Sequence, residues 1–238
     1  MTAPVSPAIA DNLAAVRSRI DAAARRAGRD PATVTLIAVS KTFDAEHVRA
    51  AWAAGQREFG ENKVQEAEQK TAATGDLTGA RWHLIGHLQS NKAKKASAIF
   101  AAIHSVDSVE LVRRIDAAAD EQGTMPELLI QVDLAGEATK FGAAEPEVEA
   151  IAREALKARV ACLAGLMLLP PWNENQEVTR PWFVRLRQLR ERLISGGIPP
   201  ASLRHLSMGM SHDFEAAIEE GATLVRVGTA IFGQRVKH

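Results

Sequence analysis

The chain has 238 residues, of which 46% are hydrophobic and 24% are charged, as is typical of a folded globular protein. Its 29 lysine and arginine residues balance 29 aspartate and glutamate residues, which excludes a bulk attraction to nucleic acid or to an anionic membrane. The one cysteine, Cys162, excludes an intrachain disulfide and a multi-cysteine metal site. No secretory signal or spanning segment is recognisable, so we expect a cytoplasmic protein.

A helix is expected near the N-terminus, after a loose tail of residues 1–6. Ser6 suits the N-cap and Pro7 suits the first turn. Apolar residues then recur at helical spacing, at Ile9, Leu13, Val16 and Ile20. Gly28 can end this helix.

Short apolar runs rich in branched residues then alternate with longer segments of helical period, which is typical of a parallel sheet built from βα units. We expect eight strands, at Thr35–Ser40, Arg57–Gly60, Trp82–Gly86, Ala102–Val106, Leu128–Val132, Ala161–Met167, His205–Met208 and Leu224–Gly228. Several runs are apolar at consecutive positions, as expected for strands covered by helices on one face and by a barrel interior on the other. The sequence therefore predicts an α/β protein with one domain over residues 1–238, a single (β/α)8 TIM-type barrel with an extra N-terminal helix.

The helix expected between the sixth and seventh strands is rich in arginine. Its apolar stripe consists of Trp182, Leu186, Leu189 and Leu193. The arginines, such as Arg185 and Arg190, fall largely on other faces. We interpret them as a solvated helix face, and an RNA site is the alternative.

In this fold, functional groups gather where strands run into the loops that follow them. Lys41 directly follows the first strand and precedes a turn in which Asp44 can cap the next helix. A lysine amine held in a dry cavity is more readily neutral and nucleophilic, which suits Schiff-base formation. Judged by position alone, Lys41 could also be a surface residue or a phosphate ligand.

The loops after the seventh and eighth strands suit a phosphate group. Residues 205–211 include the small residues Ser207, Gly209 and Ser211 and precede a helix that begins near Asp213, so backbone N–H groups there can face an anion. The eighth strand turns into the step formed by Gly228 and Thr229, and loops at these two places form the usual phosphate site of such barrels. Taken singly, Gly228 could only end a strand and Ser207 could only cap a helix.

Three further polar residues are candidates. Arg226 alternates with apolar residues in the eighth strand, so it points into the barrel or into the helix layer. A buried arginine needs partners, either a carboxylate or the ring nitrogen or phosphate of a ligand. Asn62 and His87 follow the second and third strands, where a helix cap and an ordinary loop histidine are the alternatives.

These motifs belong to a series of segments spread over nearly the whole chain, at residues 36–42, 59–66, 82–92, 165–167, 206–211, 215–218 and 225–233. Together they resemble the pyridoxal phosphate homeostasis protein family, a relative of the alanine-racemase barrel among fold-type III proteins. The resemblance implies pyridoxal 5′-phosphate (PLP) as the cofactor. It assigns Lys41 to the Schiff base, Asn62 to the side of the ring, Arg226 to the pyridine nitrogen, and Ser207, Gly228 and Thr229 to the phosphate.

Arg226 in that role has a chemical consequence. A guanidinium cannot act as an acid at neutral pH, so it donates to an unprotonated ring nitrogen and leaves the cofactor a weaker electron sink. One position departs from the family, which commonly has a second lysine two residues after the Schiff-base lysine, where this chain has Phe43. Lys140 matches a family lysine in the loop after the fifth strand, and it either takes part in cofactor handover or, as we favour, is simply exposed.

The resemblance implies a non-enzymatic protein that binds and buffers PLP and delivers it to apo PLP-dependent enzymes. From the balanced charge we expect no nucleic-acid or membrane partner, and we expect a monomer. The alternative is a PLP-dependent amino-acid racemase or decarboxylase. Racemases use a tyrosine from a second domain as the second base, whereas this chain has no tyrosine, and Cys162, expected in the core, is a poor substitute. A third hypothesis is a cofactor-free Schiff-base aldolase.

Overall fold

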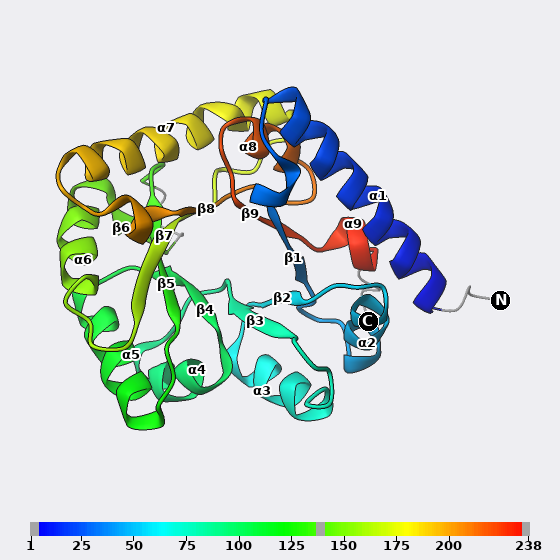
Figure 1. Ribbon diagram of the computed structural model, residues 1–238, viewed down its shortest axis with the longest axis horizontal. Coiled ribbons are helices and arrows are strands. Elements are labelled where there is room, and N and C mark those ends of the chain that lie inside the picture. Colours follow the sequence, from blue (N-terminus) through cyan, green and yellow to red (C-terminus); the bar gives the residue numbers. More distant parts are fainter. Residues whose placement is uncertain (1–4, 137–140, 235–238) are drawn as a thin grey trace.

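The computed structural model of this protein describes residues 5–136 and 141–234. Eight strands pair in parallel and close into a barrel. Each strand pairs with a neighbour on both sides: the last strand, β9, pairs with the first, β1, and β4 pairs with β5. The barrel strands are β1 (Thr35–Val39), β2 (Glu58–Glu61), β3 (Arg81–Leu84), β4 (Ala102–Val106), β5 (Glu127–Asp133), β7 (Cys162–Leu168), β8 (His205–Ser207) and β9 (Leu224–Val227). The predicted (β/α)8 barrel is confirmed, and Figure 1 shows its ring of helices.

The structure differs from the expected strands in two details. A two-residue strand, β6 (Ala143–Ala144), pairs with the end of β5, and it was not expected because two residues carry no periodic signal. Cys162 is exposed, so its predicted place in the core is wrong. It is the first residue of β7, at the rim of the barrel, where the helix layer does not cover it.

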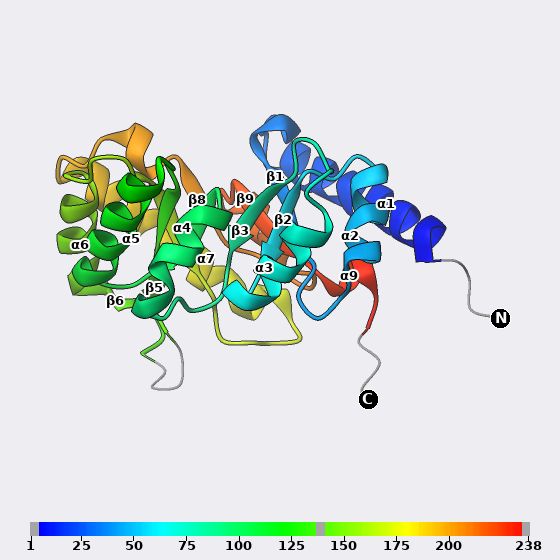
Figure 2. The ribbon, with the colours of Figure 1, turned by 90° about the horizontal axis from the view of Figure 1, so that it is seen from below.

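The α-helices form the outer layer (Figures 1 and 2). They are α1 (Val5–Arg26), α2 (Ala45–Ala53), α3 (Val64–Ala73), α4 (Ala93–Ile99), α5 (Val109–Gln122), α6 (Val148–Ala155), α7 (Gln176–Ser195), α8 (Phe214–Glu219) and α9 (Thr229–Phe232). Short 3-10 helices occur at η1 (Pro31–Thr33), η2 (Ser90–Lys92), η3 (Glu145–Glu147) and η4 (Pro200–Leu203). None of these helices is long and apolar enough to cross a membrane.

The extra helix, α1, packs against α2, α8 and α9 on the outside of the barrel (Figure 1). Its predicted apolar stripe is buried in that contact, from Ile9 to Ile20. The helix begins at Val5, one residue before the expected cap, and residues 1–4 of the expected tail lie outside the described residues. It ends near Gly28, which has a positive φ of 67° and follows the last turn, as predicted.

Side chains alternate along each barrel strand between the interior and the helix layer. The apolar interior is small, and consists of Ile37, Ala102, Leu129, Ala164, Met167 and Leu224. The much larger apolar cluster fills the space between barrel and helices. Much of the interior is therefore left to polar side chains.

The arginines of α7 form ion pairs with neighbouring glutamates. Arg180 pairs with Glu219 and Glu220 of α8 and its C-cap, and Arg192 pairs with Glu145. The opposite face of α7 buries Leu186, Leu189 and Leu193. These ion pairs agree with the predicted helix face turned away from the core. They also engage the guanidinium groups that would otherwise bind the phosphates of an RNA.

Candidate cofactor site

A cavity of about 550 Å³ opens at the carboxyl ends of the barrel strands. Its wall contains five of the six residues that the sequence assigned to a cofactor: Lys41, Asn62, Arg226, Gly228 and Thr229. They come from the ends of β1, β2 and β9, which are neighbours in the barrel. The sixth residue, Ser207, does not line this cavity.

Lys41 reaches the cavity because of strand alternation. Ile37 belongs to the barrel interior and Val39 lines the cavity, so the next residue with the same parity, Lys41, also faces the barrel mouth. Lys41 is half-buried and lies two residues after Val39, the last residue of β1. Lys41 thus lies at the first position of the turn that follows β1.

The residue before Lys41 is anchored on the opposite, helix-facing side of the sheet. Ser40 is fully buried, and its hydroxyl donates to Glu61 Oε1 at 2.6 Å. Lys70 Nζ of α3 donates to the Ser40 carbonyl and to Glu61 Oε1, both at 2.6 Å. Burial raises the pKa of Glu61, although the hydrogen bonds from Lys70 and Ser40 act in the other direction.

The residue after Lys41 is held by the same group. The Thr42 N–H donates to Glu66 Oε1, and Lys70 Nζ also reaches that oxygen at 2.9 Å. Thr42 has a φ of 71°, an unusual backbone conformation for a β-branched residue. We call Ser40, Glu61, Glu66 and Lys70 the outer cluster, and it fixes the backbone on both sides of Lys41.

The turn continues into α2 in the predicted way. Asp44 caps α2, because its side chain accepts hydrogen bonds from the N–H groups of Glu46 and His47. Phe43, at the position where the family commonly has lysine, packs its ring against Phe232 and His47. An apolar contact therefore replaces any second cation at this turn.

Arg226 points into the barrel interior and is almost fully buried. Its Nη1 donates to Ser207 Oγ at 2.6 Å, and its Nη2 donates to the Leu168 carbonyl at 2.8 Å. Within the described parts of the chain no carboxylate forms an ion pair with it, so the ion-pair alternative is not realised there. Burial lowers the pKa of Arg226 to about 10, with Asp213 acting to raise it, so the guanidinium remains charged at neutral pH.

Ser207 lies below the cavity, fully buried in the barrel interior. Its hydroxyl contacts Arg226 and His104. A second serine of the same segment, Ser211, lines the cavity instead, and its Oγ accepts from the N–H groups of Gly228 at 3.2 Å and Ala230 at 3.4 Å. Sequence reasoning missed Ser211, although it named the segment, because the choice between the two serines depends on where β8 ends.

Two glycines let backbone segments approach closely beside the cavity. A Cβ on Gly86 would lie 2.3 Å from the Asn62 carbonyl oxygen, so only glycine fits there. A Cβ on Gly228 would lie 3.2 Å from the Val39 carbonyl oxygen. Asn62 does not cap α3, whose N-cap is Lys63, and its side chain is left to the cavity wall.

Aromatic side chains border the cavity. His87 stacks on Phe141 with ring centroids 3.8 Å apart, and its Nδ1 lies 3.7 Å from Asp107 Oδ2. Phe141 is 56% exposed and Trp172, in the segment between β7 and α7, is 70% exposed. That segment projects from the lower side of the barrel in Figure 2. Lys140, the other residue singled out from the sequence here, lies outside the described residues.

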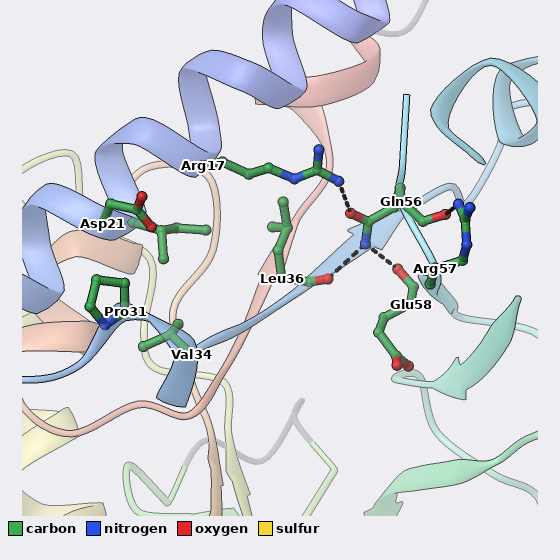
Figure 3. A pocket seen from close by; sticks show the side chains of 9 residues that line it. Arg17, Asp21, Pro31, Val34, Leu36, Gln56, Arg57 and Glu58 are labelled. Atoms are coloured by element: carbon green, nitrogen blue, oxygen red, sulfur yellow. Dashed lines mark hydrogen bonds between the residues drawn. The ribbon is translucent and has the colours of Figure 1, made fainter. Parts of the chain in front are cut away.

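A smaller pocket of about 250 Å³ lies at the opposite, amino end of β1 and β2. Figure 3 shows Gln56 in its wall, where Nε2 donates to the carbonyls of Leu36 and Glu58 and Oε1 accepts from Arg17. The polar groups of Gln56 are thus satisfied within the protein. The convergent groups that could hold a ligand are found at the other end of the barrel.

Comparison with known proteins agrees with this geometry. Residues 12–236 match the family described as "Alanine racemase, N-terminal domain", so the chain is a barrel protein of that class. An alanine racemase from Clostridium difficile superposes with a TM-score of 0.71 at 15% identity, which shows the shared fold. This chain covers 58% of that racemase.

The similarity is far greater to one branch of the class. The "Pyridoxal phosphate homeostasis protein" of Pseudomonas aeruginosa is 45% identical over 227 residues, which are 95% of this chain and 96% of the relative. The protein of that name from Escherichia coli is 40% identical over 233 residues, 95% and 97% of the two chains. PipY of Synechococcus elongatus, solved with PLP bound, is 42% identical with a TM-score of 0.84, covering 94% and 100%. The chain belongs to the pyridoxal phosphate homeostasis protein family.

Proposed function

We propose that this protein binds PLP in the cavity at the barrel mouth and holds it as a Schiff base on Lys41. The observation that carries the proposal is one cavity wall that combines Lys41, the buried cation Arg226 and the backbone of the β9–α9 turn. PLP offers three matching groups: an aldehyde for an amine, a ring nitrogen for a donor, and a phosphate for N–H groups. When bound, the cofactor supplies the aldehyde that takes up the lysine amine.

Arg226 is the donor to the ring nitrogen in this proposal. Two of its N–H groups are held by Ser207 and Leu168, and a guanidinium has five, so donors remain for a ligand in the cavity. Because Arg226 stays cationic, it keeps a facing ring nitrogen unprotonated. A cofactor in that state is stored rather than activated for carbanion chemistry.

The phosphate would lie against Gly228 and Thr229, where the chain turns from β9 into α9. We reassign the serine contact from Ser207 to Ser211, because Ser211 lines the cavity whereas the Ser207 hydroxyl contacts His104 and Arg226 in the interior. The long bonds from Gly228 and Ala230 to Ser211 leave room for an anion to compete for these N–H groups. Asn62, whose backbone Gly86 approaches closely, would lie beside the ring.

We propose a homeostatic role without turnover: sequestering a reactive aldehyde in the cytoplasm and delivering it to apo PLP-dependent enzymes, as a monomer. The names of the relatives support homeostasis. The racemase alternative needs a second acid or base, and this chain has no tyrosine. A cofactor-free Schiff-base aldolase is the third alternative, and uptake of PLP by the purified protein separates it from the proposal.

The attachment is tested with Lys41→Ala. Protein incubated with PLP is reduced with borohydride, digested and examined by mass spectrometry. We expect the wild type to carry the adduct on Lys41 and Lys41→Ala to carry none at full occupancy. A stoichiometric adduct on another lysine would refute the assignment, and a wild type that takes up no PLP would favour the aldolase.

The phosphate contact is tested with Ser211→Ala and Ser207→Ala, each titrated with PLP and with pyridoxal, which lacks the phosphate. Losing a hydrogen bond to a charged group costs about 1.5–3 kcal/mol, so Ser211→Ala should weaken PLP binding roughly tenfold or more. Its affinity for pyridoxal should be unchanged. Ser207→Ala should weaken both ligands alike, and the reverse pattern would restore the phosphate role to Ser207.

Turnover is tested by following α-proton exchange of several amino acids in D₂O by NMR. We expect the PLP-loaded protein to exchange no faster than free PLP. Exchange at enzyme-like rates that disappears in Lys41→Ala would establish the racemase-like alternative.

A further inference from the structure

Five polar side chains form a continuous line of contacts through the barrel interior. Starting from the floor, Glu58 Oε2 lies 2.6 Å from His83 Nε2, and His83 Nδ1 lies 3.0 Å from His104 Nε2. His104 Nδ1 lies 2.9 Å from Ser207 Oγ, which accepts from Arg226 Nη1 at 2.6 Å. The five residues come from β2, β3, β4, β8 and β9. We call them the interior chain.

The two ends of the interior chain determine its direction. Arginine can only donate, and an ionised carboxylate can only accept. Ser207 therefore receives a hydrogen from Arg226, and its own hydroxyl hydrogen is free to go to His104 Nδ1. A neutral His104 that accepts at Nδ1 carries its hydrogen on Nε2, where it meets His83 Nδ1. His83 then carries its hydrogen on Nε2 and donates it to Glu58.

The opposite direction is possible only if His83 is a cation. His83 would then donate to His104 Nε2, and His104 would donate to Ser207, leaving the Ser207 hydrogen without an acceptor among the described residues. A buried hydroxyl without an acceptor is unfavourable.

Protonation behaviour agrees with the first direction. Burial holds the pKa of His104 well below its ordinary value, with smaller contributions from His83, Arg226 and His205. The pKa of Glu58 lies below its ordinary value, because His83 and Arg81 outweigh the opposing effect of burial. His104 is thus neutral, and Glu58 at the lower end is an anion at neutral pH.

We propose that His104 and His83, anchored by Glu58, are positioning residues that hold Arg226 as the donor to the cofactor ring. His104 accepts the hydrogen bond from the Ser207 hydroxyl, which orients the hydroxyl hydrogen away from the guanidinium. An oxygen lone pair of Ser207 then faces Arg226 and accepts its hydrogen bond. The inference rests on the proposed function only in taking Arg226 to face the ring nitrogen. It connects the cofactor cavity with the floor of the barrel, where Glu58 also lines the smaller pocket (Figure 3).

The direction of the interior chain is tested in the wild-type protein by NMR of ¹⁵N-labelled histidine side chains, with and without PLP. We expect His83 and His104 both to be neutral with hydrogen on Nε2 and an unprotonated Nδ1. Assignment uses His83→Gln and His104→Gln. A hydrogen on Nδ1 of His104 at neutral pH would overturn the proposal, whether or not the protein binds PLP.

The effect on the ring is tested with PLP labelled with ¹⁵N in the pyridine ring, whose chemical shift separates protonated from unprotonated nitrogen. In the wild type we expect an unprotonated, hydrogen-bonded nitrogen whose shift is constant between about pH 6 and about pH 9. His104→Leu should bind PLP roughly tenfold more weakly and should make the shift pH-dependent, because the support of Arg226 is lost. His104→Asn keeps an acceptor for Ser207 and should recover part of the affinity.

The lower end is tested by Glu58→Gln, with Glu127→Gln as the matched control. Glu127 begins β5 at the same end of the barrel and pairs with Arg204 at 2.7 Å, outside the interior chain. Glu58→Gln should shift the ring nitrogen signal in the same direction as His104→Leu but less, and Glu127→Gln should leave it unchanged. Equal effects of the two glutamine variants would overturn the role of Glu58.

The outcomes separate this inference from the proposed function. If the wild type binds no PLP, the proposed function fails, and the histidine tautomers still test the interior chain. If the wild type binds PLP and His104→Leu keeps both its affinity and its ring nitrogen signal, only this inference fails. If His104→Leu does not fold, the wild-type tautomers and Glu58→Gln decide.

Discussion

Glu58 and Glu61 lie three residues apart in β2, yet their surroundings shift their pKa values in opposite directions. Glu58 faces the barrel interior, where hydrogen bonds from His83 and Arg81 lower its pKa despite burial. Glu61 faces the helix layer, where burial raises its pKa despite contacts with Lys70 and Ser40. The odd spacing of three puts the two carboxylates on opposite faces of the strand.

The difference shows how one strand supports the site from two sides. Glu61 belongs to the outer cluster, which holds the backbone on either side of Lys41. Glu58 begins the interior chain, which ends on Arg226. Glu58 keeps some contact with solvent at the barrel floor, whereas Glu61 has none, so only Glu61 lacks water to stabilise its charge.

Breaking the outer cluster at its cation should have the largest effect. Lys70→Met removes the ammonium that pairs with Glu61 and leaves that carboxylate buried, so we expect a loss of about 3 kcal/mol in the free energy of unfolding. Denaturant unfolding at pH 7 measures it. Lys95→Met, which breaks an exposed pair with Glu68, is the control and should behave like the wild type. A Lys70→Met protein as stable as that control would show that the outer cluster contributes nothing.

Removing the charges of both Lys70 and Glu61 tests whether the unpaired carboxylate causes the loss of stability. In the double variant Lys70→Met with Glu61→Gln, the buried amide is neutral and can still accept from Ser40. We expect it to recover at least about 1 kcal/mol relative to Lys70→Met alone, because an unpaired buried charge is what the single variant leaves behind. Additive losses in the double-mutant cycle would contradict this explanation.

The two glutamates should respond oppositely to pH. Glu58 has a lowered folded-state pKa, so its contribution to stability is present above the unfolded pKa of about 4.3 and is lost as pH falls through the folded pKa. Glu61 has a raised folded-state pKa, so its contribution is present below about 4.3 and is lost as pH rises through the folded pKa.

Unfolding of the wild type, Glu58→Gln and Glu61→Gln between about pH 7 and about pH 3 measures these contributions. On acidification, the stability of the wild type relative to Glu58→Gln should decrease, and its stability relative to Glu61→Gln should increase. Curves that move in the same direction for both variants would mean that the two faces of β2 do not differ in the way described.

The smallest effect is expected at Thr42, whose backbone the outer cluster holds at a φ of 71°. Thr42→Gly removes the side-chain cost of this conformation but adds freedom to the unfolded chain, so the net gain should be no more than about 1 kcal/mol. The N–H that donates to Glu66 is kept, and PLP affinity should not change. A clear loss of stability would show that the threonine side chain makes contacts that outweigh the strain.

The sequence by itself determined much of the architecture. Strands, the stripe of α1 and the cap at Asp44 follow from local periodicity and capping chemistry, which act between residues close in the chain. Lys41, Arg226 and the turn at Gly228 could be singled out for the same reason, since a strand end in a parallel barrel leads to one common face. The comparison with relatives then confirmed the family that the motifs resemble.

Only the tertiary structure decided which polar groups meet. Ser211 rather than Ser207 reaches the cavity because β8 ends at Ser207 and the residues that follow lead to the barrel mouth. The contact between His104 of β4 and Ser207 of β8 joins residues 103 positions apart across the barrel. Such partners depend on barrel closure and on the register of every strand in between, and no local pattern in the sequence encodes them.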